Sequence, residues 1–158
     1  AEHSWRLTVM AYFVKDEFPE ADIDRVIRMC MFHDMGEAFT GDIPAFEKKE
    51  SHERAERRCV EDWVSSLPEP YREDLRALYG EMEEQRTLEA KIFKALDKME
   101  ALISHNEADI STWLPLEYEL NLTYGEAQVQ FSEYMKKLRE EINRDTREKI
   151  KNEQKTQR

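Results

Sequence analysis

The residues best suited to chemistry lie in one short stretch, from His33 to Asp42. The stretch reads His-Asp-Met-Gly-Glu-Ala-Phe-Thr-Gly-Asp, so a histidine and an aspartate stand side by side and two more carboxylates follow. Imidazole nitrogens and carboxylate oxygens bind divalent metal ions, and carboxylates also transfer protons. The residue types and their spacing therefore indicate a metal site with acid–base chemistry beside it.

The segment before this pair has the periodicity of a helix that faces a protein core. Apolar residues recur at i, i+3, i+4 and i+7 from Ile23 to Cys30, and one further turn of the same period reaches His33 and Asp34. Burying a carboxylate without compensation is strongly unfavourable, so such a group is paired, neutralised or bound to a metal. Because no basic residue is adjacent to the pair, we interpret both residues as metal ligands.

Two other polar residues occupy inward positions of predicted helices. His3 begins the apolar stripe of a helix that continues to Val14. Asp97 lies on the edge of the apolar stripe of a helix predicted over about 87–106. Each of three helices thus directs polar groups towards the core. The expected metal ligands are His3, His33, Asp34 and Asp97.

Two imidazoles and two carboxylates suit one divalent ion, with Mn, Co, Fe, Ni, Zn or Mg as the candidates. Such an ion lowers the pKa of a water molecule and polarises a phosphoryl oxygen. Glu37 stands four residues after His33 and three after Asp34, so it shares their face if the helix continues. We assign Glu37 to proton transfer at the attacking water rather than to metal binding.

The elements that must position these residues are helices. Glycine and proline number 4 and 5 in 158 residues and 37% of the residues are charged, a composition that favours a single all-α domain. We expect a compact multi-helix bundle with a central metal site over residues 1–142 and a polar C-terminal helix end or tail over residues 143–158. The remaining predicted elements are helices over about 47–66 and 70–85, a short helix with packed loop over 110–124, and a last helix from Glu126.

Charge and cysteine content narrow the classes of partner. The formal net charge of −11 argues against a nucleic-acid polymer, because such binding needs Lys and Arg to neutralise phosphates. No apolar run approaches the roughly 20 residues that cross a bilayer, so no membrane partner is expected. The two cysteines, Cys30 and Cys59, argue against a disulfide framework and favour a reducing compartment. We therefore expect a cytoplasmic protein that acts on a small molecule.

These motifs resemble those of the HD-domain phosphohydrolase superfamily, whose ligands follow an H…HD…D pattern. The pattern matches the four ligands predicted above. Within the superfamily the chain looks like the 5'-deoxynucleotidase branch, and the resemblance covers about residues 1–125. Three segments carry it: Glu-His-Ser at 2–4, His-Asp-x-x-Glu-x-x-x-Gly-Asp at 33–42, and Asp-Lys at 97–98.

The resemblance implies a helical, metal-dependent phosphomonoesterase that converts deoxyribonucleoside 5'-monophosphates to deoxynucleosides and phosphate, usually as a homodimer. It implies that the four ligands bind the metal, that Glu37 assists the attacking water and that Asp42 contacts the sugar. The branch also holds phosphate with an arginine upstream of its first histidine. That position precedes Ala1, so the resemblance assigns no phosphate-binding residue here.

Two alternative functions remain open at this point. The same site would suit a hydrolase of another nucleotide, such as a phosphodiester, a dinucleoside polyphosphate or an alarmone. The chain would otherwise be a non-catalytic helical interaction protein, although Glu37 and Asp42 count against a purely structural metal site. Three arginines close in sequence to the ligands are candidate phosphate contacts, against the usual solvated state of helical arginines: Arg6, Arg25 and Arg28.

Overall fold

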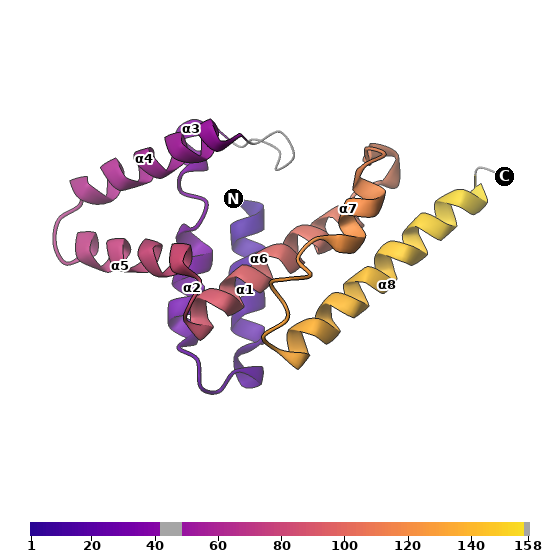
Figure 1. Cartoon of the computed structure of the whole chain (residues 1–158), viewed down its shortest axis with the longest axis horizontal. Helices are drawn as coiled ribbons and strands as arrows, with labels where there is room; N and C mark the ends of the chain where they lie inside the picture. The colour runs from indigo at the N-terminus through magenta and orange to yellow at the C-terminus, as the bar shows by residue number, and fades with distance from the viewer. Residues whose placement is uncertain (42–48, 157–158) are drawn as a thin grey trace.

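The computed structural model describes residues 1–41 and 49–156 (Figure 1). Within these ranges the chain forms helices joined by turns and irregular segments, with no strand, so the all-α prediction is confirmed. The elements are α1 (Glu2–Phe13), η1 (Lys15–Glu17), α2 (Ile23–Phe32), α3 (Glu37–Thr40), α4 (Glu50–Ser66), α5 (Tyr71–Glu84), α6 (Leu88–Glu107), η2 (Ile110–Thr112), α7 (Glu117–Thr123) and α8 (Glu133–Thr156).

Three helices form the centre of the molecule. Helices α1 and α2 lie side by side and antiparallel, and α6 crosses and packs against both (Figure 1). The hairpin of α4 and α5 lies on one side of this group, and α7 and α8 lie on the other. The apolar stripes predicted from the sequence meet here. Fully buried core residues include Leu7, Ala11, Val26, Met29, Cys30, Ile92, Leu96 and Met99.

The start and end of α2 follow from local chemistry. The carboxylate of Asp22 accepts a hydrogen bond from the backbone N–H of Arg25 at 3.0 Å and caps the helix. The α-helix ends at Phe32, and the next four residues form tight turns. In these turns the backbone N–H of Glu37 donates to the carbonyl of Asp34 at 3.0 Å. The helix thus ends just before the His-Asp pair, earlier than the loosening after the pair that the sequence predicted.

Gly36 allows α4 to pack directly on this turn. A Cβ at Gly36 would lie 3.2 Å from the Cβ of Glu56 and 3.3 Å from the Cγ2 of Val60. Such distances are tighter than ordinary van der Waals contacts, so a larger residue would push α4 away. The close approach holds the α4–α5 hairpin over the end of α2, where the candidate ligands lie.

The last helix begins later than predicted. The apolar pattern predicted a helix from Glu126, but α8 starts at Glu133 and residues 124–131 form turns. Gly125 has a φ of +71°, which is incompatible with a right-handed helix, and the hydroxyl of Ser132 accepts a hydrogen bond from the N–H of Met135 at 3.3 Å. Val129 is still 1% exposed, so it packs into the core from a turn.

Helix α8 is tied to the bundle by polar contacts. The side chain of Arg139 donates to the carbonyls of Leu122 at 2.8 Å and Tyr124 at 3.0 Å. The hydroxyl of Thr146 donates to Asn106 on α6 at 2.8 Å and is fully buried. The predicted boundary at residue 142 therefore falls inside one continuous helix that packs against α6 and the segment before Gly125.

The helices in the described ranges are too short or too polar to cross a membrane.

Candidate metal centre

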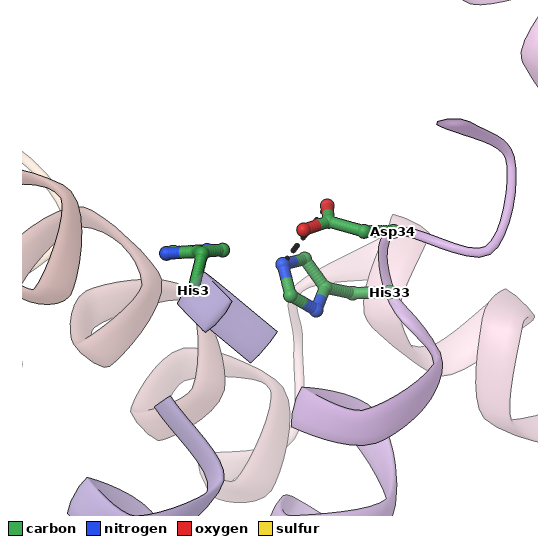
Figure 2. Close-up of side chains that lie close together, drawn as sticks. All are labelled: His3, His33 and Asp34. Carbon is green, nitrogen blue, oxygen red and sulfur yellow. Dashed lines mark ion pairs between the residues drawn. The ribbon is translucent and has the colours of Figure 1, made fainter. Parts of the chain in front are cut away.

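Three of the four predicted ligands converge at the start of α1 and the end of α2 (Figure 2). His3, His33 and Asp34 each offer one nitrogen or oxygen atom within 4.8 Å of the atoms offered by the other two. The Nε2 of His33 lies 2.9 Å from the Oδ1 of Asp34. The antiparallel packing of α1 on α2 thus brings residues 30 positions apart into one cluster.

Asp97 reaches the same cluster from α6. Its Oδ1 lies 3.1 Å from the Nε2 of His3 and 3.5 Å from the Nε2 of His33. Two donors about 2.1 Å from one ion are roughly 3.0 Å apart at a right angle and roughly 3.4 Å apart at a tetrahedral angle. These two distances are in the range for atoms that share a single cation, whereas the group of donors that all lie within 4.8 Å of one another contains His3, His33 and Asp34 and not Asp97.

The orientation of His33 supports the fit of a metal ion. Its Nδ1 lies 2.9 Å from the backbone carbonyl of Cys30, one turn earlier, and donates its proton there. Its buried Nε2 lies 2.9 Å from the Oδ1 of Asp34 and 3.5 Å from the Oδ1 of Asp97. A buried lone pair aimed at two carboxylates is the arrangement that a divalent ion satisfies. The donor set of imidazole and carboxylate suits a first-row divalent metal.

The cluster strongly stabilises positive charge. Hydrogen bonds to the carboxylates of Asp97 and Glu100 raise the pKa of His3 to about 10, although burial opposes the charged form. Burial alone would raise the pKa of Asp97, but the hydrogen bond from His3 and the charge of Lys94 outweigh it and lower that pKa. Ionised carboxylates in a partly buried site attract a divalent cation as they attract a proton.

Glu100 is a residue of the site that our sequence analysis missed. Its side chain is fully buried and hydrogen-bonds the Nδ1 of His3. The signal was present, because Glu100 stands four residues after the core residue Leu96 and three after Asp97, on the inward face of α6. A glutamate in a helix is usually read as a surface residue. Its position relative to the apolar stripe of α6 has to be worked out before its inward direction becomes visible.

A cleft of about 1200 Å³ opens over the cluster. It is lined by the four predicted ligands, by Glu37 and by residues of the α4–α5 hairpin. The helix on which Glu37 was expected to share the ligands' face ends at Phe32, but the turn that follows still brings Glu37 into the lining of the cleft. Glu37 therefore lies in the same cleft as the ligands, and its catalytic role stays a prediction. Asp42 lies outside the described residues.

The basic side chains beside the metal cluster are lysines of α6, not the arginines that the sequence suggested as phosphate contacts. The Nζ of Lys94 lies 3.0 Å from the Oδ2 of Asp97, and the Nζ of Lys98 lies 3.9 Å from the same atom. Lys98 also donates a hydrogen bond of 2.6 Å to the hydroxyl of Tyr124. The three candidate arginines instead form ion pairs outside the cleft lining: Arg6 with Glu100 and Glu107, Arg25 with Glu81, and Arg28 with Asp74.

Gly125 packs against Met99 and Lys98 without room for a side chain, so Gly125→Ala is expected to destabilise the fold by roughly 1–3 kcal/mol. The new Cβ would lie 2.7 Å from the Cε of Met99 and 2.9 Å from the Cβ of Lys98, at a φ of +71°. Urea unfolding followed by circular dichroism measures the change in free energy. Gly80→Ala is the matched control, because Gly80 is helical with no atom within 4 Å of an added Cβ, and it should stabilise α5 by about 0.5–1 kcal/mol. Equal effects of the two variants would contradict this account.

Known proteins with similar sequences and structures agree with this geometry. The chain is 35% identical over 109 residues to the 5'-deoxynucleotidase HDDC2 of Homo sapiens, which covers 68% of this chain and 52% of that protein. It is 28% identical over 109 residues to the 5'-deoxynucleotidase YBR242W of Saccharomyces cerevisiae, which covers 65% of this chain and 45% of that protein. The chain thus spans about half the length of these curated relatives.

A solved structure extends the similarity to the whole fold. The crystal structure of a predicted metal-dependent phosphohydrolase from Magnetospirillum magnetotacticum MS-1 matches 96% of this chain and 76% of that one, with a TM-score of 0.75 and 26% identity. A family model described as the HD domain matches residues 1–139, a range that includes every predicted site residue. With its histidine and aspartate cluster at the junction of α1, α2 and α6, the chain belongs to the HD-domain family.

Proposed function

We propose that this protein is a metal-dependent 5'-deoxynucleotidase that hydrolyses deoxyribonucleoside 5'-monophosphates. The observation that carries the proposal is the buried Nε2 of His33, which lies 2.9 Å from the carboxylate of Asp34 and 3.5 Å from that of Asp97 in the lining of a large cleft. The names of the human and yeast relatives support the same activity. The proposed metal ligands are His3, His33, Asp34 and Asp97.

The ion, when bound, would lower the pKa of water and polarise the phosphoryl group. Glu37 lines the cleft beside the ligands and is the proposed proton acceptor for the attacking water. In the reaction the water oxygen bonds to phosphorus while the bond from phosphorus to the 5'-oxygen breaks. The proton taken up by Glu37 then neutralises the departing 5'-oxygen, so atoms and charge balance.

Lys94 and Lys98 are the proposed contacts for the substrate phosphate. Both line the cleft and lie within 4 Å of Asp97, so their ammonium groups are at the edge of the cluster. A phosphate dianion loses hydrating water when it enters the cleft. The fixed positive charges of the two lysines would replace part of that hydration. Asp42 is the proposed sugar contact on the basis of the motif alone.

We also propose a cytoplasmic homodimer. Large apolar side chains are exposed along α1, with Trp5 at 70% and Phe13 at 75%, and exposed apolar surface of this kind favours a subunit interface. The free thiols of Cys30 and Cys59 fit a reducing compartment. Light scattering coupled to size-exclusion chromatography measures the oligomeric state, and a monomer at micromolar concentration would exclude the dimer.

The size of the cleft favours a second candidate. Sites for small molecules commonly enclose about 300–1,000 Å³, and the cleft of about 1200 Å³ has room for more than a monophosphate. A diester, a dinucleoside polyphosphate or an alarmone is therefore the alternative substrate class for the same metal site.

Phosphate release from a nucleotide panel tests the proposal. Protein stripped with a chelator and reloaded with Mn, Co, Mg or Zn is assayed on deoxy- and ribonucleoside 5'-monophosphates, 3'-monophosphates and triphosphates. Release confined to the 5'-deoxymonophosphates, and absent from the stripped protein, is expected. Metal-dependent release from other members would keep the hydrolase and refute the substrate class. No release by metal-loaded protein would favour the alternative substrates or a non-catalytic interaction protein.

A further inference from the structure

The carboxylate of Glu100 is fully buried in a core that is otherwise largely apolar. A buried charge persists only where its lone pairs are satisfied. The Oε1 of Glu100 accepts a hydrogen bond of 2.6 Å from the hydroxyl of Ser104 and forms an ion pair with the Nε of Arg6 at 2.7 Å. Its Oε2 is left to the Nδ1 of His3. Two hydrogen bonds and one ion pair therefore hold both oxygens of this carboxylate.

The ring of His3 is held between two residues of α6. Its Nδ1 contacts Glu100, and its Nε2 lies 3.1 Å from the Oδ1 of Asp97 in the metal cluster. Because Asp97 and Glu100 are three residues apart on one helix, the rigid spacing of α6 sets both contacts at once. With a metal in place of the Nε2 proton, a proton on Nδ1 that is donated to Glu100 would leave the lone pair of Nε2 directed at the cluster.

His33 shows the same arrangement with a different acceptor. Its Nδ1 donates to the carbonyl of Cys30 in its own helix, and its Nε2 faces the cluster. His3 takes its acceptor from another helix, so its orientation depends on tertiary packing. Groups that accept from the second nitrogen of a metal-binding histidine fix its tautomer and raise its basicity.

We propose that Glu100 is a positioning residue that holds His3 in the tautomer and orientation that bind the metal. Arg6 and Ser104 contact the Oε1 of Glu100, which leaves its Oε2 for His3. The inference rests on the metal site proposed above, and it assigns Glu100 no contact with metal or substrate.

A purely structural role for Glu100 predicts a different outcome. In that case the ion pair with Arg6 would only fasten α1 to α6, and metal affinity would follow overall stability. The pair of Arg6 with Glu107, at 2.6 Å, offers a comparison because it joins the same two helices, and the structure gives Glu107 no contact with His3. The side chain of Glu107 is 58% exposed, so Glu107→Gln is a mild matched control.

Zinc affinity, measured by competition with a chromophoric chelator, is the direct test. Glu100→Gln keeps the shape of the side chain but removes its charge and replaces one oxygen with an amide group. The ion pair with Arg6 is then lost, and either Ser104 or His3 must face the amide. We expect zinc binding to weaken about 10- to 100-fold. Glu107→Gln should stay within about twofold of the unchanged protein, and thermal melting of both variants reports whether stability follows.

A second measurement keeps the inference testable if Glu100→Gln does not fold. Nitrogen NMR of the zinc-loaded, unchanged protein, with His3 assigned through a His3→Gln variant, distinguishes the two ring nitrogens. A protonated Nδ1 and a zinc-bound Nε2 are expected, and the reverse would overturn the inference. Unchanged zinc affinity in a folded Glu100→Gln protein would overturn it while leaving the metal site intact. An unchanged protein that binds no zinc or manganese would overturn the proposed metal site as well.

Discussion

Asp97→Asn is expected to weaken metal binding by at least about 100-fold and to reduce turnover to background. Removal of groups that only support a ligand already costs about 10- to 100-fold in affinity, so loss of a charged ligand should cost more. The substitution also leaves Lys94 and Lys98, at 3.0 Å and 3.9 Å from Asp97, without its compensating charge beside the cluster. Calorimetric titration with manganese or zinc and phosphate release measure the two effects.

A control variant separates this effect from the loss of a carboxylate charge elsewhere in the fold. Asp74 on α5 pairs with Arg28 at 3.2 Å, and its side chain is 62% exposed. Asp74→Asn removes the same charge outside the cleft lining and should leave both metal affinity and kcat unchanged. Full metal occupancy in Asp97→Asn would refute the assignment of Asp97 as a ligand.

Glu37→Gln is expected to keep the metal and lower kcat by about 10²- to 10⁴-fold, which is the usual contribution of a positioned general base. Glutamine preserves the size of the side chain and its place in the cleft but does not accept the proton of the attacking water. Metal content by mass spectrometry and kcat on the best substrate of the panel are measured on the same sample.

The control for Glu37 lies in the same cleft. Glu61 on α4 is exposed and lines the cleft, so Glu61→Gln makes the same chemical change outside the metal cluster. It should change kcat less than about threefold, in contrast to a positioned proton acceptor. Loss of the metal together with kcat in Glu37→Gln would make Glu37 a ligand, and retained kcat would remove it from the reaction.

The sequence predicts the parts of this molecule that depend on local periodicity. The stripe from Ile23 to Cys30 identified α2, and the continuation of its spacing was enough to identify His33 and Asp34. Asp97 was found because a carboxylate interrupted a strong apolar stripe. In the fold, the Nε2 of His33 lies 2.9 Å from Asp34 and 3.5 Å from Asp97.

Tertiary contacts account for most of what the sequence did not predict. Glu100 matters because α1 places His3 against it, and no local pattern reveals that contact. The arginines near the ligands in sequence found carboxylate partners on other helices, whereas the cations of the cleft come from α6 and the α4–α5 hairpin. The start of α8 was misplaced because Val129 fits a helical period, while the positive φ of Gly125 imposes a turn.

The polar contacts of α8 link the stability of this helix to the stability of one wall of the cleft. Arg139 binds the carbonyls on either side of Thr123, and this short segment ends at Tyr124, whose hydroxyl holds Lys98 at the cleft. Opening of α8 by local unfolding would therefore release one wall of the cleft while α1, α2 and the metal ligands stay folded. In hydrogen exchange, the amides of α8 and of residues 122–124 would then share one opening free energy, below that of the central helices. The stability of α8 would in this way affect the affinity of the cleft for a nucleotide as the temperature rises.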